Sequence, residues 1–228
     1  MQMQDHQERL CAPQIQMNRP TPYIRGATAA DVPAIVQLQT MCLSHFHLVD
    51  PGPAYLRNFY SFLLDDPAGL LFVSEQDHQL AGFVAGFSDP SHLHQRVASR
   101  RFRIFAAASA CLVKHPIQLS KFLDDLHRAR RLKSEPGSSS ETACELLTIA
   151  VNPRLRRQGH GKALVLALAE AAKCNKMDQL RVHIGSEDDG MASFYRRLGF
   201  RPSRTFLASD ARRLDEYVLA IEGNGKVN

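Results

Sequence analysis

Short apolar runs alternate with longer amphipathic segments along most of the chain. The runs are rich in Leu, Val, Ile and Phe and are bounded by Gly, Pro, Asp or Asn, a pattern typical of strands. Gly82 and Gly86 interrupt one run and suggest close contact with a neighbouring element. Strands are predicted at Tyr23–Arg25, Leu70–Glu75, Gln79–Phe87, Glu145–Val151, Gln179–Gly185, Arg204–Ala208 and Glu216–Ile221. The last two read as a closing hairpin.

Apolar residues spaced three and four apart predict helices between these strands. Asp31 is expected to cap the first helix and Asp188 the last, and Gly199 should end the last one. The helices predicted in this way are Ala27–Leu43, Tyr55–Leu63, Lys162–Lys173 and Met191–Leu198.

Residues 88–142 depart from this alternation. They contain two further predicted helices, about Ser91–Lys114 and Pro116–Lys133, followed by a Gly- and Ser-rich loop. We expect this segment to be a helical insertion between the third and fourth strands. The rest forms one domain over residues 22–222, with a flexible arm at 1–21 and a loose end at 223–228.

The composition is that of a soluble globular protein, with 44% hydrophobic and 22% charged residues among 228. The 28 Lys and Arg residues outnumber the 23 Asp and Glu residues, which gives a net charge of +5 and suits an anionic ligand. Nucleic acid is not expected as a partner, because the basic residues are scattered and only 7% of residues are aromatic.

The five cysteines are odd in number, far apart and without a Cys-x-x-Cys pair. This argues against a disulfide framework and against a zinc site, and it fits a reducing compartment. His45 and His47 alternate like metal ligands, but no third ligand lies nearby, so no metal is expected.

No apolar segment reaches the roughly 18 residues that a membrane span needs. We therefore expect a cytoplasmic protein without stable membrane insertion.

The strongest candidate for chemistry is the basic, glycine-containing loop Arg156–Lys162, between an apolar strand and a helix. Gly159 and Gly161 allow close backbone approach, and the helix N-terminus offers unpaired amides and a positive dipole end. The loop alone could equally be a basic turn before an ordinary helix.

Arg156-x-x-Gly159-x-Gly161, followed by Phe194-Tyr195-Arg196-Arg197-Leu198-Gly199-Phe200, resembles the GCN5-related N-acetyltransferase (GNAT) superfamily. The resemblance is strong over Glu145–Phe200 and weaker over Tyr23–Phe87. It implies an α/β (α+β) fold with a mixed central sheet of about seven strands, splayed between the fourth and fifth and flanked by helices.

The resemblance also implies that the chain binds acetyl-CoA, with the loop on the pyrophosphate and the fourth strand, bulged, along the pantetheine arm. Tyr195 matches the tyrosine that protonates the departing thiolate, although it could simply pack under the cofactor. Asp188 stands where the family often has Asn and could instead only cap its helix. The implied cofactor-binding residues are Ile149, Ala150, Val151, Arg156, Arg157, Gln158, Gly159, His160, Gly161, Lys162, Asp188 and Tyr195.

Glu145 is one candidate for the base that deprotonates the acceptor amine, and Glu75, His183 and His47 are others that the sequence does not rank. Covalent catalysis through Cys144 is a lesser candidate, since no His at a suggestive spacing supports a dyad. The acceptor itself is expected to contact Phe46, His47, Tyr55 and His183.

The resemblance implies direct acetyl transfer to a primary amine. The long insertion and its arginines loosely resemble those of acetyltransferases of surface-sugar and small-metabolite pathways, which implies a small-molecule acceptor, with a nucleotide-linked amino sugar as one candidate. A protein or peptide amine is the alternative acceptor, and a non-catalytic acyl-CoA-binding or sensing module is the alternative function. The 88–142 insertion would then cover the acceptor site, form a homodimer interface, or dock on a membrane surface or carrier.

Overall fold

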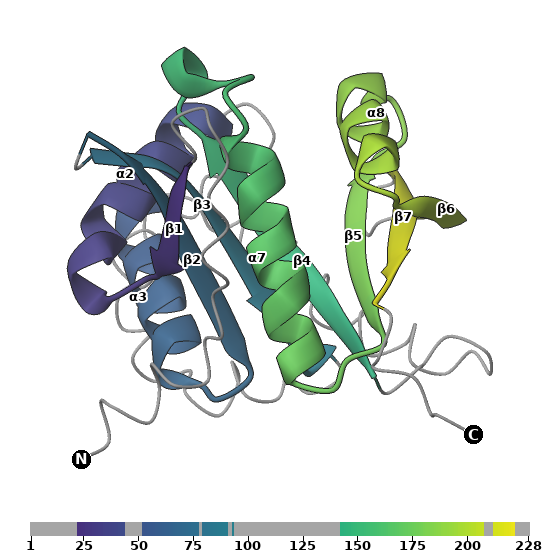
Figure 1. Ribbon diagram of the computed structural model, residues 1–228, viewed down its shortest axis with the longest axis horizontal. Helices are drawn as coiled ribbons and strands as arrows, with labels where there is room; N and C mark the ends of the chain where they lie inside the picture. The colour runs from purple at the N-terminus through teal and green to yellow at the C-terminus, as the bar shows by residue number, and fades with distance from the viewer. Residues whose placement is uncertain are drawn as a thin grey trace, which may run out of the picture.

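The computed structural model describes residues 22–43, 52–77, 79–90, 93, 142–207 and 212–221. These form a seven-stranded sheet in the order β1-β2-β3-β4-β5-β7-β6, with helices on both faces (Figure 1). The strands are β1 Tyr23–Gly26, β2 Gly69–Gln76, β3 Gln79–Phe87, β4 Ala143–Val151, β5 Gln179–Gly185, β6 Arg201–Leu207 and β7 Arg213–Ala220. The α-helices are α2 Val32–Leu43, α3 Gly52–Asp65, α7 His160–Cys174 and α8 Asp189–Arg197, with short 3-10 helices η1 Ala29–Asp31 and η2 Pro153–Leu155.

The predicted mixed fold is confirmed, and the strands and helices expected within the described ranges are found to within a few residues. Every neighbouring strand pair is antiparallel except β4 and β5, which are parallel. The two helices expected within residues 88–142, the terminal arm, and Phe46 and His47 lie outside the described residues. None of the described helices is long and apolar enough to cross a bilayer.

Two apolar layers hold the sheet. On one face, α2 packs on β3 and β4, and α3 packs on β2. On the other face, α7 packs on β2, β3 and β4, and α8 completes the layer beside β5 and β7. Gly86 makes the α7 contact possible: a Cβ there would lie 2.6 Å from Leu168 Cδ1. The close neighbour expected from the glycines of β3 is therefore α7.

β4 carries an extra residue in the middle of its pairing with β3. Ala85 pairs with Thr148, but the next residue, Gly86, pairs with Leu146, so Leu147 is left without a partner in a β-bulge. The parallel pairing with β5 ends at the same level, at Leu146↔Val182. Beyond that pair the described part of β4 keeps only β3, and the described part of β5 keeps only β7. The two strands diverge from there (Figure 1).

The bulge also reverses which side chains of β4 face which layer. Leu147 packs against the α2/α3 layer, and the next residue, Thr148, hydrogen-bonds Tyr60 of α3. Two consecutive residues on one face break the strand alternation. As a result Ile149 and Val151 face the α7/α8 layer at the parting. In a regular strand with the same residues and no bulge, they would point to the other face.

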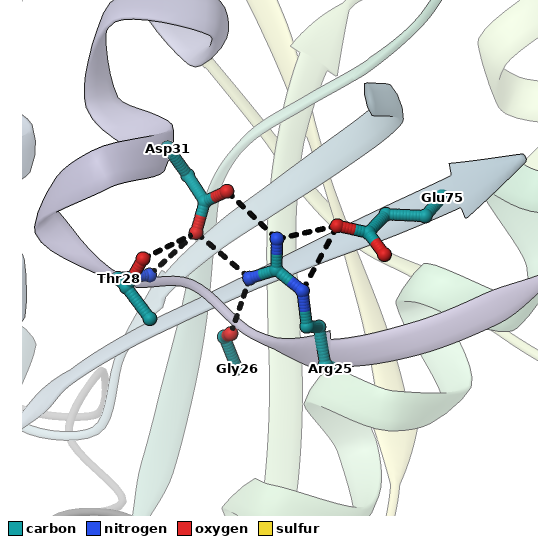
Figure 2. A network of polar contacts seen from close by, with 5 residues as sticks. All are labelled: Arg25, Gly26, Thr28, Asp31 and Glu75. Atoms are coloured by element: carbon teal, nitrogen blue, oxygen red, sulfur yellow. Dashed lines mark hydrogen bonds and ion pairs between the residues drawn. The ribbon is translucent and has the colours of Figure 1, made fainter. Parts of the chain in front are cut away.

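A polar network fixes the entry to α2 (Figure 2). The Arg25 guanidinium donates to both carboxylate oxygens of Asp31, at 2.8 Å each, and also to Glu75 on β2. Asp31 in turn accepts from the backbone N–H of Thr28 at 2.7 Å. The expectation that Asp31 is the helix cap was wrong: Thr28 is the cap residue of η1, and Asp31 closes the capping box three residues later.

We predict that Asp31→Asn lowers the free energy of unfolding by about 1–2 kcal/mol at pH 7, after allowance for partial exposure. The hydrogen bonds from Arg25 lower the pKa of Asp31 to about 2. This stabilisation is present above the unfolded-state pKa of about 3.9 and is lost as the pH falls toward the folded-state value. Urea unfolding between about pH 7 and pH 2.5 measures it, with Asp178→Asn as an exposed control. A pH-independent difference between Asp31→Asn and the wild type would contradict the prediction.

Candidate functional site

The open end of the sheet, where β4 and β5 part, is also where two helices begin. β4 leads through η2 into the N-terminus of α7, and β5 leads through a short turn into the N-terminus of α8. Because the strands are parallel, both helix N-termini lie at the carboxyl ends of the diverging strands. The positive ends of two helix dipoles therefore lie near the parting. Asp188 already caps the start of α8, so the unpaired amides that an anionic ligand requires are those of α7.

Two residues of the loop before α7 have left-handed backbone conformations that shape it. Arg157 has φ 63° and Gly159, the N-cap of α7, has φ 96°. The first hydrogen bond of the helix runs from Ala163 N–H to the Gly159 carbonyl at 3.0 Å. The amides of residues 160–162 consequently have no acceptor within the helix and point out of its N-terminus. The predicted loop therefore has the main-chain geometry of an anion site.

Gly161, in the first turn of α7, faces Phe194 of α8. A Cβ at this position would lie 3.4 Å from Phe194 Cζ and 3.8 Å from Val151 Cγ2, so a longer side chain would enter the space next to the parting strands. Arg156 folds back, with Nε 3.4 Å from the Val151 carbonyl oxygen, while Gln158 is exposed. The loop thus presents backbone and basic side chains at the end of β4.

His160 is predicted to contact a cofactor as part of the loop whose N–H groups bind an anion, and its side chain points elsewhere, toward β2. It is 3% exposed, with Nδ1 2.6 Å from Ser74 Oγ and Nε2 3.0 Å from Gln76 Oε1, both on β2. Because an amide oxygen only accepts, Nε2 carries the hydrogen and Nδ1 accepts from the Ser74 hydroxyl. Burial lowers the pKa of His160, which keeps the ring neutral. Its imidazole anchors the loop to the sheet, and only its main chain faces the candidate site.

Tyr195 and Asp188 lie on one side of α8. The Tyr195 ring is 1% exposed and meets the rings of Phe194 and Phe200 edge-on, both at 5.1 Å. Side chains of a helix lean toward its N-terminus, so the phenol is directed toward the open end. Burial and the charge of Asp188 raise the pKa of Tyr195 above the ordinary value expected from the sequence, so the phenol keeps its proton. Asp188 caps α8 by accepting from Met191 N–H at 2.9 Å.

A second polar cluster lies on the opposite face of the sheet. His183 follows the last β4–β5 pair, and its Nδ1 is 3.3 Å from Glu145 Oε1 on β4. Its Nε2 is 3.2 Å from Glu216 Oε2 on β7, and the same carboxylate oxygen accepts from Arg204 Nη2 on β6 at 3.2 Å. The cluster therefore links four strands beside the parting, and it brings together two residues named from sequence, Glu145 and His183.

Other candidates are placed elsewhere. Glu75 of β2 forms an ion pair with Arg25 of β1 and is not part of the cluster that contains Glu145. Cys144 is fully buried, and burial together with the Glu145 charge raises its pKa to about 12, so it stays a thiol rather than a nucleophilic thiolate. Tyr55 stacks on Phe59 in the α2/α3 layer, and burial raises its pKa to about 12.

Sequence reasoning missed Glu216, Arg204, Ser74 and Gln76. Ser74 is a polar residue inside an apolar strand, which is a weak signal. Glu216 begins an apolar run, and nothing in the sequence shows that β7 would lie between β5 and β6 and so bring it to His183.

The chain is similar in sequence pattern and fold to known proteins of one family. The model of the Acetyltransferase (GNAT) family matches residues 32–200. The ribosomal-protein-S18-alanine N-acetyltransferase from Escherichia coli has 15% identity and a TM-score of 0.56, with 91% of this chain and 99% of that chain covered. The ribosomal-protein-alanine N-acetyltransferase from Brucella melitensis has 18% identity and a TM-score of 0.55, with 87% and 99% covered.

The Salmonella typhimurium protein yncA, solved with its cofactor acetyl-CoA, has 14% identity and a TM-score of 0.53, with 90% of this chain and 97% of that chain covered. No curated protein sequence matches the chain. At these identities the structural likeness is one of fold.

We predict that Ser74→Ala lowers the free energy of unfolding by about 1–3 kcal/mol, because it leaves the buried Nδ1 of His160 without a hydrogen-bond donor. Urea unfolding provides the measurement. Ser193→Ala is the matched control, since its hydroxyl accepts from Arg197 at an exposed site and its loss should cost about 0.5 kcal/mol or less. Equal losses in the two variants would show that the His160 anchor contributes nothing.

Proposed function

Since this chain belongs to the acetyltransferase (GNAT) family and is therefore an acyltransferase, we propose that it transfers an acetyl group directly from acetyl-CoA to a primary amine of a small molecule. The observation that carries the proposal is the meeting of two helix N-termini where β4 and β5 part. That arrangement offers an anion site and an open strand edge side by side.

The residues present fit the cofactor. A pyrophosphate needs several amide donors, positive potential and room, and the loop supplies the N-terminal amides of α7, basic side chains and a glycine in place of a blocking side chain. We assign the pyrophosphate to the main chain of residues 157–162, with Arg156, Arg157 and Lys162 adding charge. The His160 side chain has no part in this contact other than to hold the loop in place.

The open edge of β4 fits an extended, amide-containing arm. Ile149, Ala150 and Val151 lie beyond the last pair with β5, so their main chain can pair with the pantetheine amides as another strand would. Bound acetyl-CoA supplies an acetyl thioester, whose acyl group is activated toward an amine nitrogen. A backbone N–H on this edge would stabilise the negative charge that develops on the carbonyl oxygen during transfer.

Tyr195 is assigned to the protonation of the departing thiolate. Its raised pKa keeps the phenol protonated, although it also makes the phenol a weaker acid, and its ring packs edge-on against Phe194 and Phe200. The inert Cys144 favours direct attack over a covalent acyl-enzyme. Asp188 is assigned the cap of α8, with no more than a secondary contact to the cofactor.

The acceptor is assigned to the face of the sheet opposite α7 and α8. Those helices cover the cofactor face, whereas Glu145 and His183 are partly exposed on the other face beside the parting. Glu145 is the proposed proton acceptor for the incoming ammonium. Phe46, His47 and Tyr55 remain predicted contacts of the acceptor, and the first two lie outside the described residues.

Protein N-terminal amines are the alternative acceptor class, because two proteins of this fold are named ribosomal-protein-alanine N-acetyltransferases. A thiol-release screen with amino sugars, nucleotide-linked amino sugars, simple amines and alanyl peptides separates the classes. Turnover with peptides alone would replace the small-molecule assignment.

We predict that calorimetry shows micromolar binding of acetyl-CoA to the wild type and no binding to Gly161→Glu, because the new carboxylate would enter the anion site. Gly161→Ala is the control at the same position: its Cβ would make only ordinary contact with Phe194 and should leave binding intact. Thermal unfolding checks that both variants fold. Retained affinity in folded Gly161→Glu would remove this loop from cofactor binding.

We predict that Tyr195→Phe lowers kcat at least about tenfold with little change in acetyl-CoA affinity, since only the acidic proton is lost. Steady-state thiol release and calorimetry measure the two quantities. An unchanged kcat would take Tyr195 out of the mechanism.

Binding without turnover for every amine in the screen would support the non-catalytic acyl-CoA-binding module instead.

A further inference from the structure

We infer that Glu145, His183 and Glu216 act as one proton-accepting unit for the acceptor amine, in which Glu216 is a positioning residue that holds the His183 ring toward β4. The inference rests on the proposed function, because only an acetyl acceptor that arrives as an ammonium needs such a unit. It joins Glu145 and His183, both candidates from the sequence, to Glu216 of β7, for which the sequence suggested no role.

The geometry supports a unit rather than separate residues. The two nitrogens of His183 contact carboxylates on different strands, at 3.3 Å to Glu145 and 3.2 Å to Glu216. The Glu145 and His183 side chains are about equally exposed, at 27% and 29%, whereas the Glu216 side chain is only 6% exposed. The two outer members can reach a ligand, while the buried carboxylate can act only through the ring it holds. This is the arrangement of a nucleophile-activating base oriented by a third group.

The groups that face the ring come from every strand around it. Glu145 belongs to β4, Glu216 to β7 and Arg204 to β6, and Arg181 lies two residues earlier on the same face of β5. The edge of the ring contacts Phe206 of β6, with 5.2 Å between the ring centroids. No group of three His, Cys, Asp or Glu side chains in the described ranges is arranged to hold a metal ion. Ion pairs link the ring to both carboxylates, and Glu216 to Arg204.

The charges decide which proton can move. Burial alone lowers the pKa of His183, but the hydrogen bonds and charges of Glu145 and Glu216 outweigh it and raise the pKa to about 9. Burial tends to raise the pKa of Glu216, but the His183 hydrogen bond and Arg204 lower it to about 2, so it stays an acceptor. Nε2 therefore keeps its hydrogen toward Glu216, and the exchangeable proton is the one on Nδ1, beside Glu145 and the parting strands.

The proton balance for one transfer is simple. A primary ammonium loses two protons on becoming an acetamide: the unit accepts one and frees the nitrogen lone pair, and the other leaves with the thiol. The C–N bond forms as the C–S bond breaks, and the unit returns its proton to water. Since Nδ1 must first release its own proton, kcat/KM should rise with pH through the His183 pKa.

The first experiment needs no substrate. NMR titration of His183 in the full-length protein should give a raised pKa in the wild type and a value at least about one unit lower in Glu216→Gln, which keeps an acceptor for Nε2 but loses the charge. Asp215→Asn is the matched control, because this neighbouring carboxylate lies on the other face, bonded to Ser186 and Thr205. It should leave the His183 titration unchanged. An unshifted titration in Glu216→Gln overturns the coupling.

The second experiment is the pH profile of kcat/KM with one fixed amine. In Glu216→Gln the rising limb should move to lower pH by the same amount as the NMR titration, and His183→Gln should lose that limb and at least about tenfold in kcat/KM. The ionisation of the amine contributes equally to every profile. A uniform loss of rate in Glu216→Gln without a shift means a structural role only and overturns the proposal.

The two readouts separate this inference from the proposed function. If no amine is acetylated by any variant while the NMR shift is found, the acetyltransferase assignment fails and the proton-accepting role fails with it. If acetylation occurs and His183→Gln keeps the wild-type profile, the proposed function stands and the unit is overturned.

Discussion

One extra residue in β4 shapes the site. The bulge at Leu147 coincides with the end of the β4–β5 ladder at Leu146, so the same local irregularity bends the strand and ends its pairing. A central sheet normally pairs every strand edge, because unpaired backbone groups are costly when buried. Here the unpaired edge lies between two helix N-termini, where a bound, amide-containing ligand can complete it. The proposed cofactor site is thus an interruption of the sheet.

An interruption of this kind is stable only if packing holds both halves of the sheet in place. α7 fixes β2, β3 and β4 through the close contact at Gly86, and the rings of Tyr195, Phe194 and Phe200 belong to the same apolar layer. The His160–Ser74 bond adds a polar tie from the loop to a strand remote from the parting. The loop is therefore positioned before any ligand arrives, which lowers the entropic cost of binding.

On the face opposite α7 and α8, the sheet carries a polar cluster beside the parting. His183 joins Glu145 to Glu216 across the start of the parting, and Arg204 extends the chain of charges to the edge strand. A buried carboxylate such as Glu216 is costly unless it is paired, and its two cationic partners offset that cost. The same pairs also orient the imidazole, so structure and chemistry depend on the same contacts.

The sequence by itself determined the elements and the anion loop, because strand and helix periodicity and glycine conformations are local properties: Gly159 has the positive φ that its place before α7 suggested. The family motif added the parting of β4 and β5. The direction of the His160 side chain could not be predicted, since a loop residue may face the ligand or the sheet, and only the packing of α7 on β2 decides. Nor could the partnership of His183 and Glu216, which are far apart in sequence and meet only because β7 inserts between β5 and β6. Tertiary structure decided these contacts because strand order and register are set by the burial of whole faces, not by any local pattern.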